Sequence, residues 1–142
     1  MGKRRIGLAA SDAERILAFP LDVLQRSSPR ADLDHLLARI DERRVGVLVV
    51  GIPVREGGSE GRISKDARFL GSKLAALRPA LQVEYADEAY TTVEAEERLR
   101  ERGLDSRAQR SVIDSVAAQI LLEGWLDRVQ ADPGGPGRSS AD

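Results

Sequence analysis

Cysteine is absent from this chain of 142 residues, histidine occurs once, and aromatic residues make up only 4%. Without cysteine the chain can form no disulfide, no thiolate metal site and no thiol nucleophile. The single histidine, His35, lies off the leucine face of its predicted helix, so catalysis by histidine is unsupported. No apolar run approaches the roughly 18 residues of a membrane span, and the N-terminus lacks the apolar stretch of a signal peptide. These absences predict a soluble, cytoplasmic protein with no membrane partner.

Neither sign of charge is in large excess, since 22 Lys and Arg residues face 23 Asp and Glu residues and the net charge is −1. A chain of this kind has no general attraction to a polyanion, so contacts with nucleic acid must come from a local basic patch. Lys3, Arg4 and Arg5 form one candidate patch. A second group of arginines, between residues 98 and 110, alternates with glutamates, which is typical of a solvated helix.

Residues 1–129 are predicted to form one α/β domain, because the hydrophobic pattern changes repeatedly between strand and helix periodicity. The predicted elements are a hairpin (5–12 with 19–24), a helix beginning at Pro29, a strand (45–54), a helix (63–77), a strand (81–88) and two helices (91–103 and 106–129). The nearly unbroken apolar run 45–54 predicts a strand covered on both faces at the centre of a sheet. A hairpin followed by βα units predicts a mixed sheet with helices on both faces. Residues 130–142 are rich in proline and glycine and are expected to be disordered.

Two adjacent carboxylates, Asp87 and Glu88, stand where the second of these strands gives way to a loop. Open α/β sheets usually place their ligands at this edge. Successive strand side chains point to opposite faces, so only one of the two can point into a given site. The sequence leaves the choice open, and it also permits either residue to cap the helix that begins near Thr91.

Asp114 gives a sharper signal, because on a helix it shares a face with Ala117, Ala118 and Leu121, which are core-type residues. Small residues such as Ser115 and Ala118 let this helix lie close to a sheet and bring the carboxylate near the strand ends. The alternative interpretation is a carboxylate in the first turn of a frayed helix. The pattern favours a functional aspartate.

A glycine-rich segment, Gly57-Gly58-Ser59-Glu60-Gly61, precedes the helix 63–77. Its backbone N–H groups could hold a phosphate at a helix N-terminus, although it lacks the Gly-Lys-Ser/Thr ending of a P-loop. A plain loop is the alternative. We expect Gly57, Gly58 and Ser59 to contact a backbone phosphate.

Taken together, these segments resemble the YqgF/RuvX family, Holliday-junction-resolvase-like members of the ribonuclease H superfamily. The resemblance covers nearly the whole chain to about Val129. Four ordered segments carry it: residues 2–12, residues 49–53 with 58–61, Asp87-Glu88 with Thr91-Thr92-x-Glu94-Ala95, and Ile113-Asp114-x-x-Ala117-Ala118-x-Ile120-Leu121.

The resemblance implies a ribonuclease H-like mixed sheet and a metal-dependent nuclease that matures the 5′ end of precursor 16S rRNA. Asp87, Glu88 and Asp114 would then be catalytic residues and ligands of two Mg²⁺ or Mn²⁺ ions roughly 4 Å apart. Lys3, Arg4, Arg5 and the glycine-rich loop would contact phosphates. Three alternatives remain: a Holliday-junction resolvase acting on branched DNA, an inactive protein that binds nucleic acid or ribosomal particles, and, ranked last, a nucleotide-binding relative of the sugar kinases and actin-like ATPases. A monomer and a homodimer are both compatible with the sequence.

The chain departs from the family pattern in two places. Ala89 stands where the family usually has arginine, which removes a partner for a phosphate or carboxylate. The family also begins with a strand that ends in a metal-binding aspartate, and Met1 and Gly2 occupy the two positions after it. In the family this strand lies between the first strand of the hairpin and the strand 45–54, so its absence would leave backbone groups unpaired. We expect the true start to lie upstream.

Overall fold

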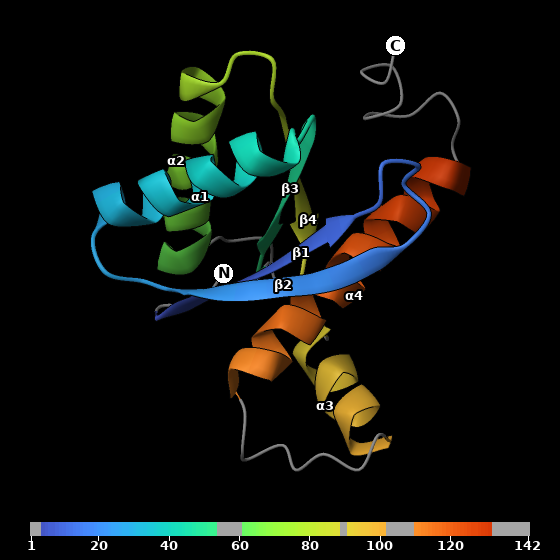
Figure 1. Ribbon diagram of the computed structural model, residues 1–142. Coiled ribbons are helices and arrows are strands. Elements are labelled where there is room, and N and C mark those ends of the chain that lie inside the picture. The colour runs from blue at the N-terminus through green and yellow to red at the C-terminus, as the bar shows by residue number, and fades with distance from the viewer. Residues whose placement is uncertain (1–3, 54–60, 89–90, 102–109, 132–142) are drawn as a thin grey trace.

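The computed structural model describes residues 4–53, 61–88, 91–101 and 110–131. Two hairpin strands come first, and the remaining two strands alternate with helices (Figure 1). The elements are β1 (Arg5–Ser11), β2 (Ala18–Gln25), α1 (Pro29–Arg43), β3 (Val47–Ile52), α2 (Arg62–Leu77), β4 (Gln82–Asp87), α3 (Thr91–Glu101) and α4 (Arg110–Ala131). The predicted order of elements and the α/β class are confirmed. None of the helices in the described ranges is both long enough and apolar enough to cross a membrane.

The hairpin forms where the sequence predicts it. β1 and β2 pair in antiparallel fashion, with Ile6 opposite Leu24 and Ser11 opposite Ala18. The Asp12 carboxylate accepts hydrogen bonds from the backbone N–H groups of Ile16 and Leu17, at 2.7 and 3.0 Å. These bonds satisfy donors that the tight turn would otherwise leave open.

Helices α1 and α2 cover one side of the strands (Figure 1). α1 begins as its sequence predicts, because the Ser28 hydroxyl accepts from the Ala31 N–H at 3.1 Å and Pro29 occupies the first turn. A hydrophobic core joins these helices to the strands, and its buried members are Ile6, Leu24, Leu36, Ile40, Leu74 and Leu81. The guanidinium of Arg78, which follows α2, also donates two hydrogen bonds to the Asp41 carboxylate at the end of α1.

The strands do not form one continuous sheet in the described part of the chain. β1 pairs only with β2, and β3 pairs in parallel only with β4, from Val47 opposite Gln82 to Ile52 opposite Asp87. The expectation that β3 is a central strand is therefore wrong for this structure. No ladder joins β1 to β3 within the described ranges, so β3 keeps one open edge and its residues 47–51 are only half-buried.

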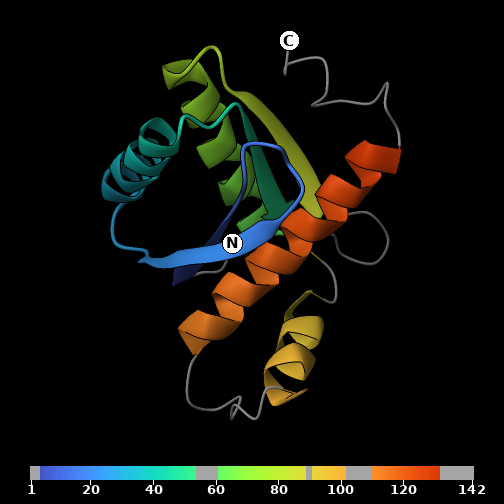
Figure 2. The same ribbon diagram turned by 45° about the vertical axis from the view of Figure 1, so that its right-hand side comes forward.

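Helix α4 crosses the opposite side of both strand pairs, and α3 packs against its N-terminal half (Figure 2). The Ser115 hydroxyl donates to the Leu21 carbonyl, and the Gln119 side-chain amide donates to the Ala18 carbonyl, each at 3.0 Å. Helices thus lie on both sides of the strands, as predicted. α4 begins at Arg110 and has no acidic residue in its first turn, so Asp114 is not a frayed first-turn carboxylate.

Candidate active site

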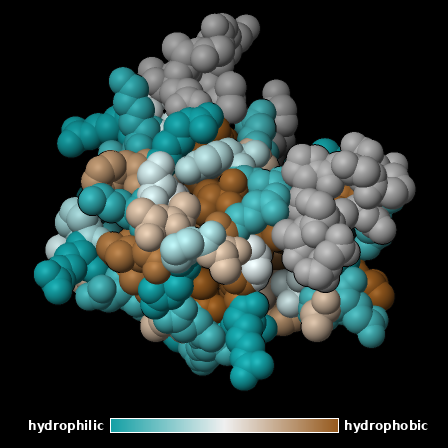
Figure 3. Space-filling view, turned by 90° about the horizontal axis from the view of Figure 1, so that it is seen from above, coloured by the Kyte–Doolittle hydropathy of each residue, from teal (hydrophilic) through white to brown (hydrophobic). Residues whose placement is uncertain are grey.

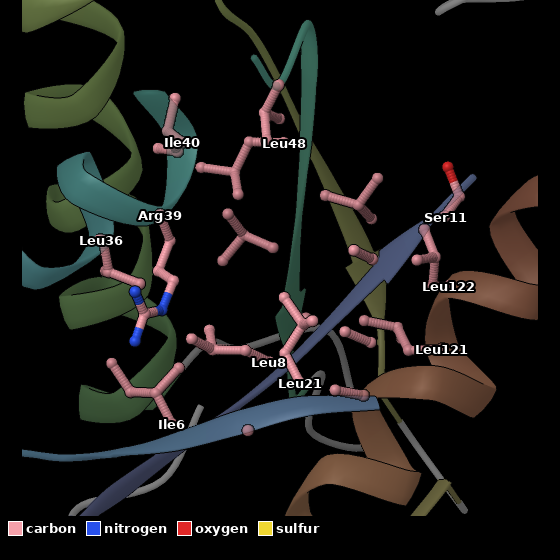
Figure 4. Close-up of a pocket in the computed structure, with 18 of the residues that line it drawn as sticks. Ile6, Leu8, Ser11, Leu21, Leu36, Arg39, Ile40, Leu48, Leu121 and Leu122 are labelled. Carbon is pink, nitrogen blue, oxygen red and sulfur yellow. The ribbon is translucent and has the colours of Figure 1, made fainter. Parts of the chain in front are cut away.

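A large cavity separates the two strand pairs. Its volume is about 1440 Å³, and β1, β3 and residues of α1, α2 and α4 form its wall. The close-up shows Leu8 of β1, Leu48 of β3 and Leu121 of α4 around the same space (Figure 4). Much of the wall is apolar, and protein interiors are normally packed as densely as organic crystals, so an unfilled space of this size between two strand pairs is unusual.

Gly7 of β1 lets the backbone of α4 lie very close to β1 at the wall of this cavity. A Cβ atom added to Gly7 would lie 2.1 Å from the carbonyl oxygen of Asp114 and 2.5 Å from its carbonyl carbon. Both atoms belong to the helix backbone, which cannot rotate away as a side chain can. Glycine at position 7 therefore fixes where Asp114 lies relative to β1.

Asp114 faces the cavity, as its helical position predicts. Asp114, Ala117, Ala118 and Leu121 all belong to the cavity wall. The Asp114 carboxylate accepts a hydrogen bond from Arg5 Nε at 2.6 Å, and both side chains are about one-third exposed. Sequence reasoning missed this ion pair, because its partners are 109 residues apart and no local pattern links them.

Glu88, rather than Asp87, lines the cavity together with Asp114. Glu88 lines the cavity, whereas Asp87 is exposed and is not part of the cavity wall. The Glu88 N–H donates to the Ile52 carbonyl at 3.1 Å, which continues the β3–β4 ladder by one bond and keeps the alternation of the strand. A Cβ atom added to Gly51 would lie 2.9 Å from Glu88 Oε2, so the carboxylate of Glu88 covers Gly51. Glu88 and Asp114 are therefore the pair of predicted carboxylates that share one space.

The described residues do not make a complete metal site. No group of three or more histidine or carboxylate side chains placed to hold a metal ion occurs in the described ranges. Glu88 and Asp114 offer two carboxylates of the kind that Mg²⁺ and Mn²⁺ accept, but Arg5 already neutralises Asp114. A third carboxylate is needed before these residues fit the predicted ions.

Most of the predicted phosphate-binding residues lie outside the described residues, namely Lys3, Gly57, Gly58 and Ser59. The same holds for Ala89 and, apart from the last two residues of α4, for the predicted tail 130–142. Arg4 is exposed beside the start of β1. Arg5 Nε donates to Asp114, while the other guanidinium N–H groups of this partly exposed side chain remain as donors for a phosphate.

Comparison with known proteins decides the family. The family model described as RuvX, Holliday junction resolvase, matches residues 1–128. This chain belongs to the RuvX family. The mixed α/β structure is consistent with the ribonuclease H-like fold of that family.

The chain matches curated relatives over most of their length. A protein of Anaeromyxobacter sp. is 42% identical over 127 residues, which are 89% of this chain and 92% of that protein. One from Picosynechococcus sp. is 39% identical over 130 residues, or 92% and 90% of the two chains. One from Mycobacterium ulcerans is 38% identical over 135 residues, or 95% and 79%. All three are named, provisionally, as pre-16S rRNA nucleases.

Proposed function

We propose that this protein is a nuclease that hydrolyses phosphodiester bonds during maturation of the 5′ end of precursor 16S rRNA in the cytoplasm. The names of its RuvX relatives support this substrate. The observation that carries the proposal is that Glu88 and Asp114 line the same cavity, and that Glu88 directly follows the carboxyl end of β4 beside that of β3. Ligands of open α/β sheets usually bind at this edge.

Mg²⁺ or Mn²⁺ is the proposed cofactor. When bound, such an ion would polarise a phosphodiester and lower the pKa of a water molecule. Glu88 and Asp114 would supply two of the ligands, and Asp114 would first have to exchange Arg5 for the cation. A third carboxylate must come from a segment that the described residues do not include.

We propose that this segment is an extended strand that fills the cavity and pairs with both β1 and β3. The observations that favour it are the open edge of β3, the lack of a β1–β3 ladder in the described ranges, and the apolar wall between them. A strand of about six or seven residues would match β1 and β3 in length. If a short turn joins it to Arg4, it must run antiparallel to β1, because parallel neighbours need a long crossover.

The first test is to read the genomic DNA upstream of the first codon. The expected result is an in-frame apolar strand that ends in aspartate, and its absence would contradict the proposal. The chain that includes this segment is called the strand-extended chain below. Amide hydrogen exchange of β1 and β3 is then compared with and without the segment. Slower exchange at both open edges is expected, and unchanged exchange would show that the segment lies elsewhere.

Activity is tested with the chain as given, the strand-extended chain and its Asp114→Asn variant. We expect Mn²⁺-dependent cleavage of precursor 16S rRNA by the strand-extended chain only. Equal activity in all three proteins would refute the role of the carboxylates. Circular dichroism of each protein verifies that the variants are folded.

Two other functions have specific support. The matching family model is described as a Holliday junction resolvase, so four-way DNA is included as a second test substrate. Faster cleavage of four-way DNA than of precursor rRNA would make branched DNA the proposed substrate. The second alternative is an inactive protein that binds nucleic acid or ribosomal particles. The ion pair with Arg5 favours it, because it occupies the Asp114 carboxylate that a metal ion would need. RNA binding by the strand-extended chain in EDTA, together with no cleavage when Mn²⁺ is present, would establish that alternative.

A further inference from the structure

The exposed side of α2 combines positive charge with an aromatic ring. Hydrophobic residues reach the surface at several places (Figure 3), and Phe69 is one of the most exposed, at 61%. Phe69 lies on α2 with three exposed cations at helical spacing, Arg62, Lys65 and Lys73. These four residues are called the α2 basic face. They extend over about 16 Å of the helix axis.

Charge distinguishes this helix from the other three. The exposed residues of α2 include four cations and one carboxylate, Asp66. The corresponding residues of α3 include three glutamates and one arginine, those of α1 include three carboxylates and two arginines, and those of α4 include one of each sign. In a chain with a net charge of −1, α2 is therefore the one helix whose described surface is clearly positive.

In the described parts of the chain, Arg62, Lys65 and Lys73 take part in none of the ion pairs found. The cations of those pairs include Arg5, Arg26, His35, Arg39, Arg78 and Arg98. The Lys73 ammonium instead lies 5.4 Å from the centre of the Phe69 ring. This arrangement keeps an aromatic surface and a positive charge together in solvent, which is the combination that single-stranded nucleic acids bind.

The start of α2 is attached to the strand that leads to the candidate active site. The Ser64 hydroxyl, fully buried, donates to the Pro53 carbonyl at 2.7 Å. Pro53 directly follows β3, and the Ile52 carbonyl accepts from the Glu88 N–H. The first turn of α2, which carries Arg62, is therefore fixed to the end of β3 to which Glu88 is also hydrogen-bonded.

We propose that the α2 basic face binds the phosphate backbone of single-stranded RNA next to the candidate active site, with a base stacked on Phe69. The inference rests on the proposed nuclease function, since it assigns a substrate-binding surface to that site. Arg62, Lys65 and Lys73 contact phosphates without reading sequence. Phe69 accepts any base, because every base has a flat aromatic face.

The test measures binding of a fluorescent single-stranded oligoadenylate in EDTA, so that cleavage does not interfere. The variant Arg62→Gln/Lys65→Gln/Lys73→Gln is compared with a charge-matched control, Arg30→Gln/Arg100→Gln/Arg128→Gln, whose exposed cations lie on the other three helices. The loss of three phosphate contacts should reduce the slope of log K against log salt by about 2. Phe69→Ala should weaken binding about tenfold with little change of that slope.

The possible results separate this inference from the proposed function. If the unmodified protein does not bind RNA, both are overturned. If it binds and the α2 triple variant behaves like the control, only the α2 inference fails. A surface that docks an acidic protein instead of RNA would give that same unchanged RNA binding. Circular dichroism checks the fold of the variants, and glutamine favours helix about as well as lysine and arginine.

Discussion

Replacing Gly7 by alanine should separate β1 from α4. The added Cβ would lie 2.1 Å from the Asp114 carbonyl oxygen, far inside van der Waals contact. β1 is hydrogen-bonded to β2, and α4 is hydrogen-bonded to β2 through Ser115 and Gln119, so neither element can move alone. Overpacking of this kind costs typically 1–3 kcal/mol, and the upper end applies because the atoms met are backbone, giving about 3 kcal/mol.

Gly46 supplies a matched control for the same chemical change. A Cβ atom added there would meet nothing within 4 Å, and its φ lies outside the left-handed region. Gly46→Ala should therefore leave stability unchanged or raise it by about 0.5 kcal/mol, through the lower entropy of the unfolded chain.

Thermal unfolding of the two variants measures the difference. For a domain of this size about 1 kcal/mol corresponds to roughly 4 °C, so Gly7→Ala should lower the melting temperature by about 12 °C. Gly46→Ala should melt within about 2 °C of the unmodified protein. Equal melting temperatures would refute the close approach of α4 to β1, and with it the position given to Asp114.

Three further predictions test the local structure. The Cβ atom of Gly51→Ala would lie 2.9 and 2.8 Å from the flexible ends of the Glu88 and Leu121 side chains, so the change should lower the free energy of unfolding by only about 1 kcal/mol. It should nevertheless displace Glu88 and lower the cleavage rate of the strand-extended chain about 100-fold. A loss of activity no larger than the loss of folded protein would contradict this. Ser28→Ala removes the acceptor for the Ala31 N–H and should lower the free energy of unfolding in urea by about 1 kcal/mol, whereas an unchanged midpoint would argue against the cap. Hydrogen bonds from Arg78 lower the pKa of Asp41, so this stabilisation is present above the unfolded value of about 4 and is lost as the pH falls through the lower folded value. An acid titration of Asp41→Asn should therefore show a weaker fall of stability below about pH 4, and the same fall as in the unmodified protein would exclude this contribution.

Local patterns were sufficient to predict the elements of this fold. The hairpin, the cap at Ser28 and the amphipathic helices follow from turn chemistry and hydrophobic periodicity, which depend on neighbours in the sequence. The position of Asp114 on an apolar face of α4 was predicted for the same reason, because helical spacing alone places it beside Ala117 and Ala118.

Features that depend on distant parts of the chain could not be predicted. Strand alternation left Asp87 and Glu88 as alternatives for the cavity-lining carboxylate. The choice between them required the β3–β4 register and the position of the Glu88 carboxylate over Gly51. The Arg5–Asp114 ion pair depends on how α4 crosses β1. The apolar run at β3 correctly indicated a strand, but its position at an open edge depends on which other strands are present to pair with it. Glycines in the strands were the available signal for close approach, since glycine inside a strand often marks one.

The central claim is that phosphodiester cleavage takes place between Glu88 and Asp114. It is tested most directly by the rates at which the Glu88→Gln and Asp87→Asn variants of the strand-extended chain cleave precursor 16S rRNA. The two residues are adjacent and each change removes one negative charge, but only Glu88 lines the cavity with Asp114. We expect Glu88→Gln to reduce cleavage to background and Asp87→Asn to keep most of the activity. Loss of activity in Asp87→Asn together with an active Glu88→Gln would contradict the claim.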